Sequence, residues 1–150
     1  MALKKNRKGF ALVLTVLILL FLSLIVLHLL SLIHSDALSQ GYEEKFIHSE
    51  YLADACIQDV VANLEENEDW EPSDWGTQFK GWPGKEYPSG SGNGYNVHKF
   101  TSVDLPDGNR IVRFESKGYC KDVERAVNVS ISVTKKSDGT IIVKVFKYSD

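Results

Sequence analysis

Residues 10–33 read FALVLTVLILLFLSLIVLHLLSLI and contain no Asp, Glu, Lys or Arg. These 24 residues include four polar side chains: Thr15, Ser23, His28 and Ser31. A helix of this length measures about 36 Å, whereas the hydrocarbon core of a bilayer is about 30 Å thick. The stretch is therefore long enough to cross a membrane, and we predict a membrane-spanning helix over residues 10–35.

A basic segment precedes the apolar stretch. Residues 1–9 contain four basic side chains and no acidic one, and no basic residue follows until Lys45. Because basic residues stay on the cytoplasmic side, we expect the N-terminus inside and the remaining chain outside the membrane. A secretory signal has a shorter apolar region, of about 7–15 residues, so we expect the helix to be retained. The alternative is a secreted soluble domain, cut after Ala37 and beginning at Leu38.

The next segment has an amphipathic pattern. Its apolar residues recur at the spacing of one helical face, and no proline occurs before Pro72. The face comprises Ala53, Ile57, Val60, Val61 and Leu64. This spacing predicts an amphipathic helix over residues 36–66, continuous with the spanning helix, whose apolar face needs a covering partner.

Residues 67–150 form the predicted extracytoplasmic head. Its first part, residues 67–94, is rich in Gly and Pro, which predicts a loop. Four β-rich stretches follow, separated by tight-turn residues, and the clearest one alternates apolar and polar side chains. These predicted strands are Tyr95–Val103, Ile111–Tyr119, Val127–Val133 and Thr140–Tyr148. We therefore predict an α+β fold, with the long helix packed on a four-stranded antiparallel sheet.

The junction Lys8-Gly9-Phe10 separates the basic leader from the apolar helix. A basic leader, this junction, an apolar helix and a strand-rich head follow one another in an order that resembles type IV pilins and pseudopilins. Residues 115–119 with 125–129 are also similar to the strand–turn–strand of pilin heads. The resemblance implies cleavage after Gly9 by a prepilin peptidase and N-methylation of Phe10.

The same resemblance implies partners and a location. The partners would be other pilin or pseudopilin subunits and an inner-membrane assembly platform. The protein would cross the bacterial cytoplasmic membrane once and then enter a cell-surface or periplasmic filament. Major pilins carry a glutamate at the fifth mature position, which here is Leu14. This departure favours a minor pilin or pseudopilin that initiates the filament or occupies its tip.

Two further sets of residues are candidates for specific roles. Cys56 and Cys120 both lie in the part expected outside the cytoplasm, where they are candidates for one disulfide; the alternative is two free thiols. Trp70, Trp75 and Trp82 fall within 13 residues and are candidates for an interaction surface. The alternative is that they fix the Gly-rich loop onto the sheet.

Other classes of function find little support in the sequence. It has no nucleophile–base pattern and no phosphate-binding loop, so we expect neither an enzyme nor a cofactor. The four histidines are scattered, and the acidic run over residues 65–74 lacks EF-hand spacing, so we expect no metal site. Residues 110–150 carry a net charge of +4, too modest a clustering to indicate nucleic acid. The alternative function is a single-span, membrane-anchored protein whose outer domain binds a partner.

Overall fold

The computed structural model describes residues 3–76 and 78–148. The predicted leader and head also include residues 1, 2, 77, 149 and 150, which lie outside the described residues. The chain divides into two compact units, residues 1–41 and residues 42–150.

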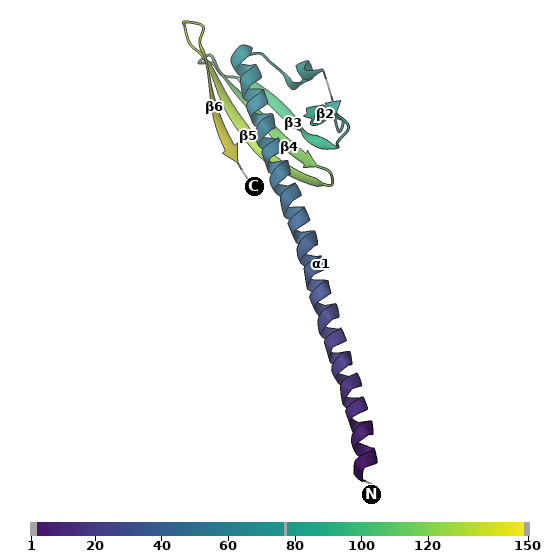
Figure 1. Ribbon diagram of the computed structural model, residues 1–150. Helices are drawn as coiled ribbons and strands as arrows, with labels where there is room; N and C mark the ends of the chain where they lie inside the picture. Colours follow the sequence, from purple (N-terminus) through teal and green to yellow (C-terminus); the bar gives the residue numbers. More distant parts are fainter. Residues whose placement is uncertain (1–2, 77, 149–150) are drawn as a thin grey trace. The chain divides into compact units, whose positions relative to one another are not determined.

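One long helix, α1 (Leu3–Glu66), contains the predicted spanning and amphipathic segments (Figure 1). The prediction of a continuous helix to residue 66 is confirmed, and α1 also includes residues 3–9 of the predicted leader. No proline interrupts it. The first residue after the helix is Asn67, whose side-chain Oδ1 accepts a hydrogen bond from the backbone N–H of Asp69 at 3.1 Å. Because this turn competes with the next helical hydrogen bonds, asparagine here favours the end of the helix.

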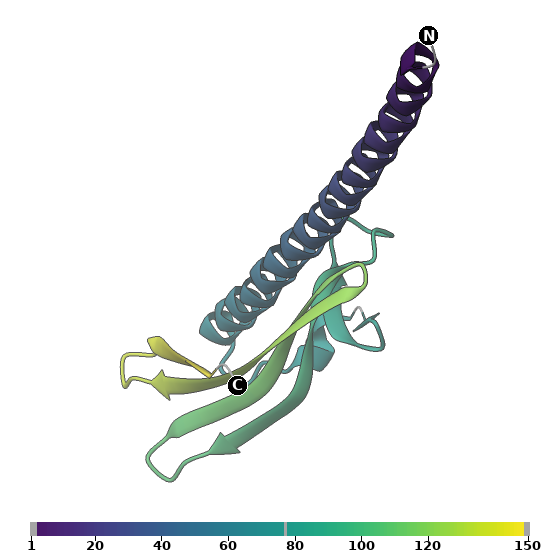
Figure 2. The same ribbon diagram turned by 90° about the horizontal axis from the view of Figure 1, so that it is seen from below.

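Within the described part of the head, six strands form one antiparallel sheet in the order in which they occur along the chain (Figure 2). They are β1 (Gln78–Phe79), β2 (Trp82–Glu86), β3 (Asn93–Asp104), β4 (Asn109–Cys120), β5 (Val123–Lys135) and β6 (Ile141–Tyr148). The prediction of an α+β fold with an antiparallel sheet is confirmed. The predicted number of four strands is wrong.

The two additional strands, β1 and β2, lie in the segment predicted to be a loop. A Cβ atom on Gly84 would lie 2.2 Å from the carbonyl oxygen of Tyr95, and one on Gly94 would lie 2.3 Å from that of Lys85. These glycines therefore allow β2 and β3 to approach closely. From the sequence alone, the Gly-rich and Pro-rich composition of the segment favours a flexible loop instead. Between β1 and β2, Lys80 and Gly81 have φ angles of 51° and 84°, which suit a two-residue hairpin turn.

The core of the head lies between α1 and one face of the sheet (Figures 1 and 2). From α1 it receives the apolar face that the sequence predicts, and from the sheet it receives the side chains that alternate toward the helix. Among its members are Ile57, Val60, Leu64, Val112, Phe114, Val129, Ile131 and Val133. The expectation that the sheet covers the amphipathic part of the helix is therefore confirmed.

Candidate functional site

The apolar segment of α1 is exposed along its whole length. Each large apolar side chain from Phe10 to Ile33 is about half exposed or more, and that of Phe10 is 71% exposed. Soluble monomers rarely expose apolar patches larger than a few hundred Å², so such a surface indicates a membrane or another protein as its surroundings. In the described part of the chain, α1 is the one helix long and apolar enough to span a membrane.

Two of the polar side chains in this segment are hydrogen-bonded within the helix itself. The Thr15 hydroxyl donates to the carbonyl oxygen of Leu12 at 2.8 Å, and the Ser23 hydroxyl donates to that of Leu19 at 2.8 Å. In lipid an unsatisfied polar group costs several kcal/mol. These two hydroxyls are therefore compatible with apolar surroundings.

The junction residues Gly9 and Phe10 lie within α1, and both are exposed. Among the described residues, no atom outside the local helix backbone lies within 4 Å of a Cβ atom built on Gly9. A glycine inside a helix costs about 1 kcal/mol relative to alanine. Packing against the described residues thus gives no reason for a glycine at position 9, and its cost points to a requirement outside the fold.

Of the two alternatives for the cysteines, the structure has the free thiols: Cys56 and Cys120 are unbonded and buried among the described residues. The Cys56 thiol donates to the carbonyl oxygen of Asn96 at 3.6 Å, and its neighbourhood includes Ser116. Cys120 lies four residues beyond Ser116 on β4, a distance of about 13 Å along a strand. A disulfide needs Cα atoms no more than about 7 Å apart, so the two positions are too far separated along the strand.

The three tryptophans do not form a common exposed surface, so that interpretation is wrong for two of them. Trp70 is buried in the core, and Trp75 is partly buried, with their ring centroids 5.4 Å apart. Both fix the segment after α1 onto the sheet, as the alternative interpretation proposed. Trp82 is 45% exposed, and its ring lies 3.9 Å from that of His98.

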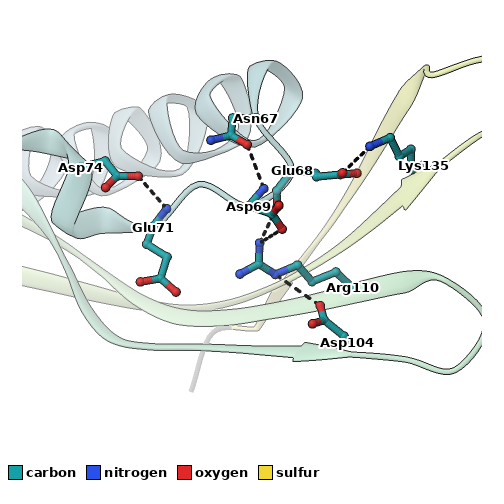
Figure 3. A network of polar contacts seen from close by, with 8 residues as sticks. All are labelled: Asn67, Glu68, Asp69, Glu71, Asp74, Asp104, Arg110 and Lys135. Carbon is teal, nitrogen blue, oxygen red and sulfur yellow. Dashed lines mark hydrogen bonds and ion pairs between the residues drawn. The ribbon is translucent and has the colours of Figure 1, made fainter.

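A polar network joins the end of α1 to the sheet (Figure 3). The Arg110 guanidinium donates to the carbonyl oxygen of Glu68 and pairs with Asp69 at 3.5 Å and with Asp104 at 3.7 Å. Lys135 pairs with Glu68. Part of the acidic run is thus neutralised by basic residues of the sheet. No group of three or more His, Cys, Asp or Glu side chains in the described chain is arranged to hold a metal ion.

A second polar contact, which sequence reasoning missed, joins the middle of the amphipathic helix to the sheet. The Asp59 carboxylate accepts hydrogen bonds from the Lys85 ammonium and from the Tyr95 hydroxyl. Burial, together with the hydrogen bond to Asp59, raises the pKa of Tyr95 well above its usual value. Burial also raises the pKa of the Cys56 thiol to about 12. Cys56 is therefore a protonated structural thiol at neutral pH, without nucleophilic character.

The face of the sheet turned away from α1 carries a third group of residues that sequence reasoning missed. A depression of about 310 Å³ lies on β3–β5, and its lining includes Lys99, Arg113, Glu115, Asn128 and Ser130. One signal in the sequence could have pointed to this depression: the alternation of β5 places Asn128 and Ser130 on the polar side of the strand. The β-bulge that brings Lys99 beside them has no clear sequence signature.

Comparisons of the chain with protein-family models, with curated proteins and with solved structures find no match. The features of the molecule that bear on its function are therefore the exposed apolar segment, the junction at its start and the surfaces of the head.

Proposed function

We propose that this protein is a minor type IV pilin or pseudopilin, a structural subunit that initiates or ends a filament. The observation that carries the proposal is the Lys8-Gly9-Phe10 junction at the start of an exposed apolar helix. Gly9 costs helix stability, and no packing partner among the described residues requires it. A peptidase that needs a small residue before the scissile bond explains this glycine.

In this proposal the apolar segment has two successive environments. Before assembly, residues 10–33 lie in the cytoplasmic membrane, where their side chains replace water contacts with lipid contacts. During assembly the segment leaves the bilayer and packs against the apolar helices of other subunits. Because both environments are apolar, the transfer exposes little apolar surface to water, and the head stays outside the membrane throughout.

Leu14 supports a minor role for this subunit. A glutamate at the fifth mature position is costly inside lipid unless it finds a partner. Leu14, which is 48% exposed, avoids that cost and cannot pair with the N-terminal amine of a neighbouring subunit. A subunit without this contact is suited to the start or the tip of a filament, where fewer neighbours surround it.

The proposal is tested by comparing substitutions at the two glycines of α1. In cells that contain a prepilin peptidase, Gly9→Leu is expected to block removal of residues 1–9, measured as the mass of the N-terminal peptide. Gly41→Leu is the matched control, because a Cβ atom at Gly41 also meets no described atom within 4 Å. The control is expected to be cleaved like the wild type. Normal cleavage of Gly9→Leu would contradict the proposal and favour a simple membrane-anchored binding protein.

A further inference from the structure

The face of the sheet turned away from α1, here called the open face, has an unusual composition. Val112, Val129 and Ile131 point toward the core, so their neighbours along β4 and β5 point to the open face. The strand register places Arg113, Ser130 and Phe146 in one row across β4, β5 and β6. The next row is Ile111, Ser132 and Lys144. A stripe of small polar side chains on β5 is thus flanked by two basic side chains, one aromatic and one aliphatic side chain.

On β4 and β6, two basic side chains of the open face have no acidic partner among the described residues. They are Arg113 and Lys144, both exposed. Of the other basic side chains on this face, Lys99 pairs with Glu115 at 3.2 Å and Lys117 with Glu124 at 2.6 Å. The Lys80 ammonium lies over the Tyr119 ring, 4.0 Å from its centroid. The open face therefore has an excess of positive charge, although residues 36–150 have a net charge of −7.

The depression on this face is a consequence of the local backbone. The register between β3 and β4 shifts between His98 and Thr101, and Lys99 has a φ of 53° within this bulge. The bulge directs Lys99 toward Glu115, and the short side chain of Ser130 lines the same depression. The resulting hollow offers ammonium, guanidinium, hydroxyl, amide and carboxylate groups within one lining.

Aromatic rings lie close to these polar groups. Phe146 is 52% exposed and occupies the same row as Arg113 and Ser130. The exposed Trp82 ring contacts the His98 ring at an interplanar angle of 59°. The Nδ1 of His98 lies 3.3 Å from the Glu115 carboxylate of the depression. An exposed aromatic ring provides a flat apolar surface, on which the C–H face of a sugar ring can pack.

We propose that the open face binds an anionic polysaccharide, a chain of acidic sugars whose carboxylates reach Arg113 and Lys144. A guanidinium recognises a carboxylate through two parallel hydrogen bonds. The sugar hydroxyls hydrogen-bond to the polar stripe of β5, and one ring packs on Phe146. This inference goes beyond the proposed function, and it does not depend on maturation or on filament assembly.

The number of basic residues favours an acidic polysaccharide over nucleic acid. Proteins that bind duplex DNA commonly neutralise about 6–10 phosphates, because DNA carries one charge per about 1.7 Å of helix axis. Besides Lys80, whose ammonium lies over the Tyr119 ring, the described open face offers two cations without an acidic partner. Two cations separated by a polar stripe instead suit a polymer with one carboxylate per sugar and uncharged hydroxyl groups between the charges.

The test measures binding of the full-length protein, in detergent micelles, to polygalacturonate. Neutral dextran and duplex DNA serve as the comparison polymers. We expect binding to polygalacturonate that weakens as the salt concentration rises. The double variant Arg113→Gln, Lys144→Gln is expected to raise the Kd about tenfold or more. The matched control Lys121→Gln, Lys136→Gln makes the same charge change at exposed turn positions and should bind like the wild type.

A third variant separates a sugar site from nonspecific attraction between charges. Phe146→Ala keeps every charge and is expected to raise the Kd about threefold or more, because the ring contact is lost. Thermal unfolding checks that each variant is folded. The proposal is overturned if polygalacturonate binds no better than dextran, if DNA binds more tightly, or if Phe146→Ala or the double variant binds like the wild type.

Discussion

Gly118 controls how closely the helix packs on the sheet. A Cβ atom on this residue would lie 1.9 Å from the carbonyl oxygen of Ser49 and 2.5 Å from the amide nitrogen of Ala53. The Ser116 hydroxyl donates to the carbonyl oxygen of Ala53 at 2.7 Å, so the helix backbone is also held by a buried hydrogen bond. The glycine therefore serves close approach, and a side chain at position 118 would separate the two layers.

We expect Gly118→Ala to lower the free energy of unfolding of the head by about 1–3 kcal/mol, the usual cost of overpacking. The measurement is thermal unfolding followed by circular dichroism. Gly41→Ala is the control, because its Cβ atom meets no described atom within 4 Å and alanine favours a helix. The control should leave the melting temperature unchanged or raise it. A Gly118→Ala variant as stable as the wild type would show that the layers can separate without cost.

Two turn aspartates link the stability of the head to pH. The Asp107 carboxylate accepts the backbone N–H of Asn109 at 3.1 Å, and Asp138 accepts that of Thr140 at 2.9 Å. These hydrogen bonds lower the pKa of both carboxyl groups below the usual value of about 3.9. Their contribution to stability is therefore fully present above the pKa of the unfolded chain. It is lost as the pH falls through the lowered pKa of the folded state.

The double variant Asp107→Asn, Asp138→Asn keeps an acceptor in each turn and removes the titration. Its melting temperature is expected to fall less than that of the wild type between about pH 5 and about pH 2. A smaller fall, rather than none, is expected because hydrogen bonds also lower the pKa of Glu86 and Asp122. Identical pH profiles for variant and wild type would contradict this role for the turns.

At the scale of elements, the Asp59 carboxylate joins α1 to β2 and β3. We expect Tyr95→Phe to lower the free energy of unfolding by about 0.5–1.5 kcal/mol, the net value of one hydrogen bond. Asp59→Ala should cost about 1–3 kcal/mol, because it leaves a buried hydroxyl and an ammonium without their acceptor.

The two substitutions share one hydrogen bond, so their effects should not add in a double-mutant cycle. Thermal or denaturant unfolding measures all three variants. Glu50→Ala, at an exposed position of the same helix, should stay within about 0.5 kcal/mol of the wild type. Additive effects of Asp59→Ala and Tyr95→Phe would mean that the contact contributes nothing to the attachment of the helix.

The elements also mark how far the sequence predicts the fold. Periodicity identified α1 and strands β3 to β6, because regular spacing of apolar side chains reports a buried face directly. It missed β1 and β2, because their Gly and Pro content is typical of loops. Gly84 and Gly94 allow β2 and β3 to pair closely, and this role becomes clear only once the partner strand is known. The attachment of Trp70 and Trp75 was left open for a similar reason, because composition does not tell a buried ring from an exposed one.

At the scale of the candidate sites, sequence reasoning was informative where the signal is local. The apolar segment and the junction at Gly9 are continuous in the chain, so the sequence alone could identify them. Whether Cys56 pairs with Cys120 was left open, because the answer depends on positions along β4 that no local pattern reports. The open face depends on the register of three strands and on a bulge, neither of which the sequence specifies.

At the scale of the whole molecule, the chain combines an exposed apolar helical segment with a head that has its own core. The central claim is that this combination is a filament subunit that a peptidase matures at the junction between leader and apolar segment. The claim can be tested at the Gly9–Phe10 peptide bond and at the amine of Phe10. The test needs no knowledge of which filament, secretion or motility system is involved.

The most direct measurement is the intact mass of the N-terminal peptide, from cells that contain a prepilin peptidase. We predict that residues 1–9 are absent and that the new N-terminal residue, Phe10, carries one methyl group. An N-terminus at Met1 or at Leu38 would contradict the claim. The first result would indicate a membrane-anchored binding protein, and the second a secreted domain.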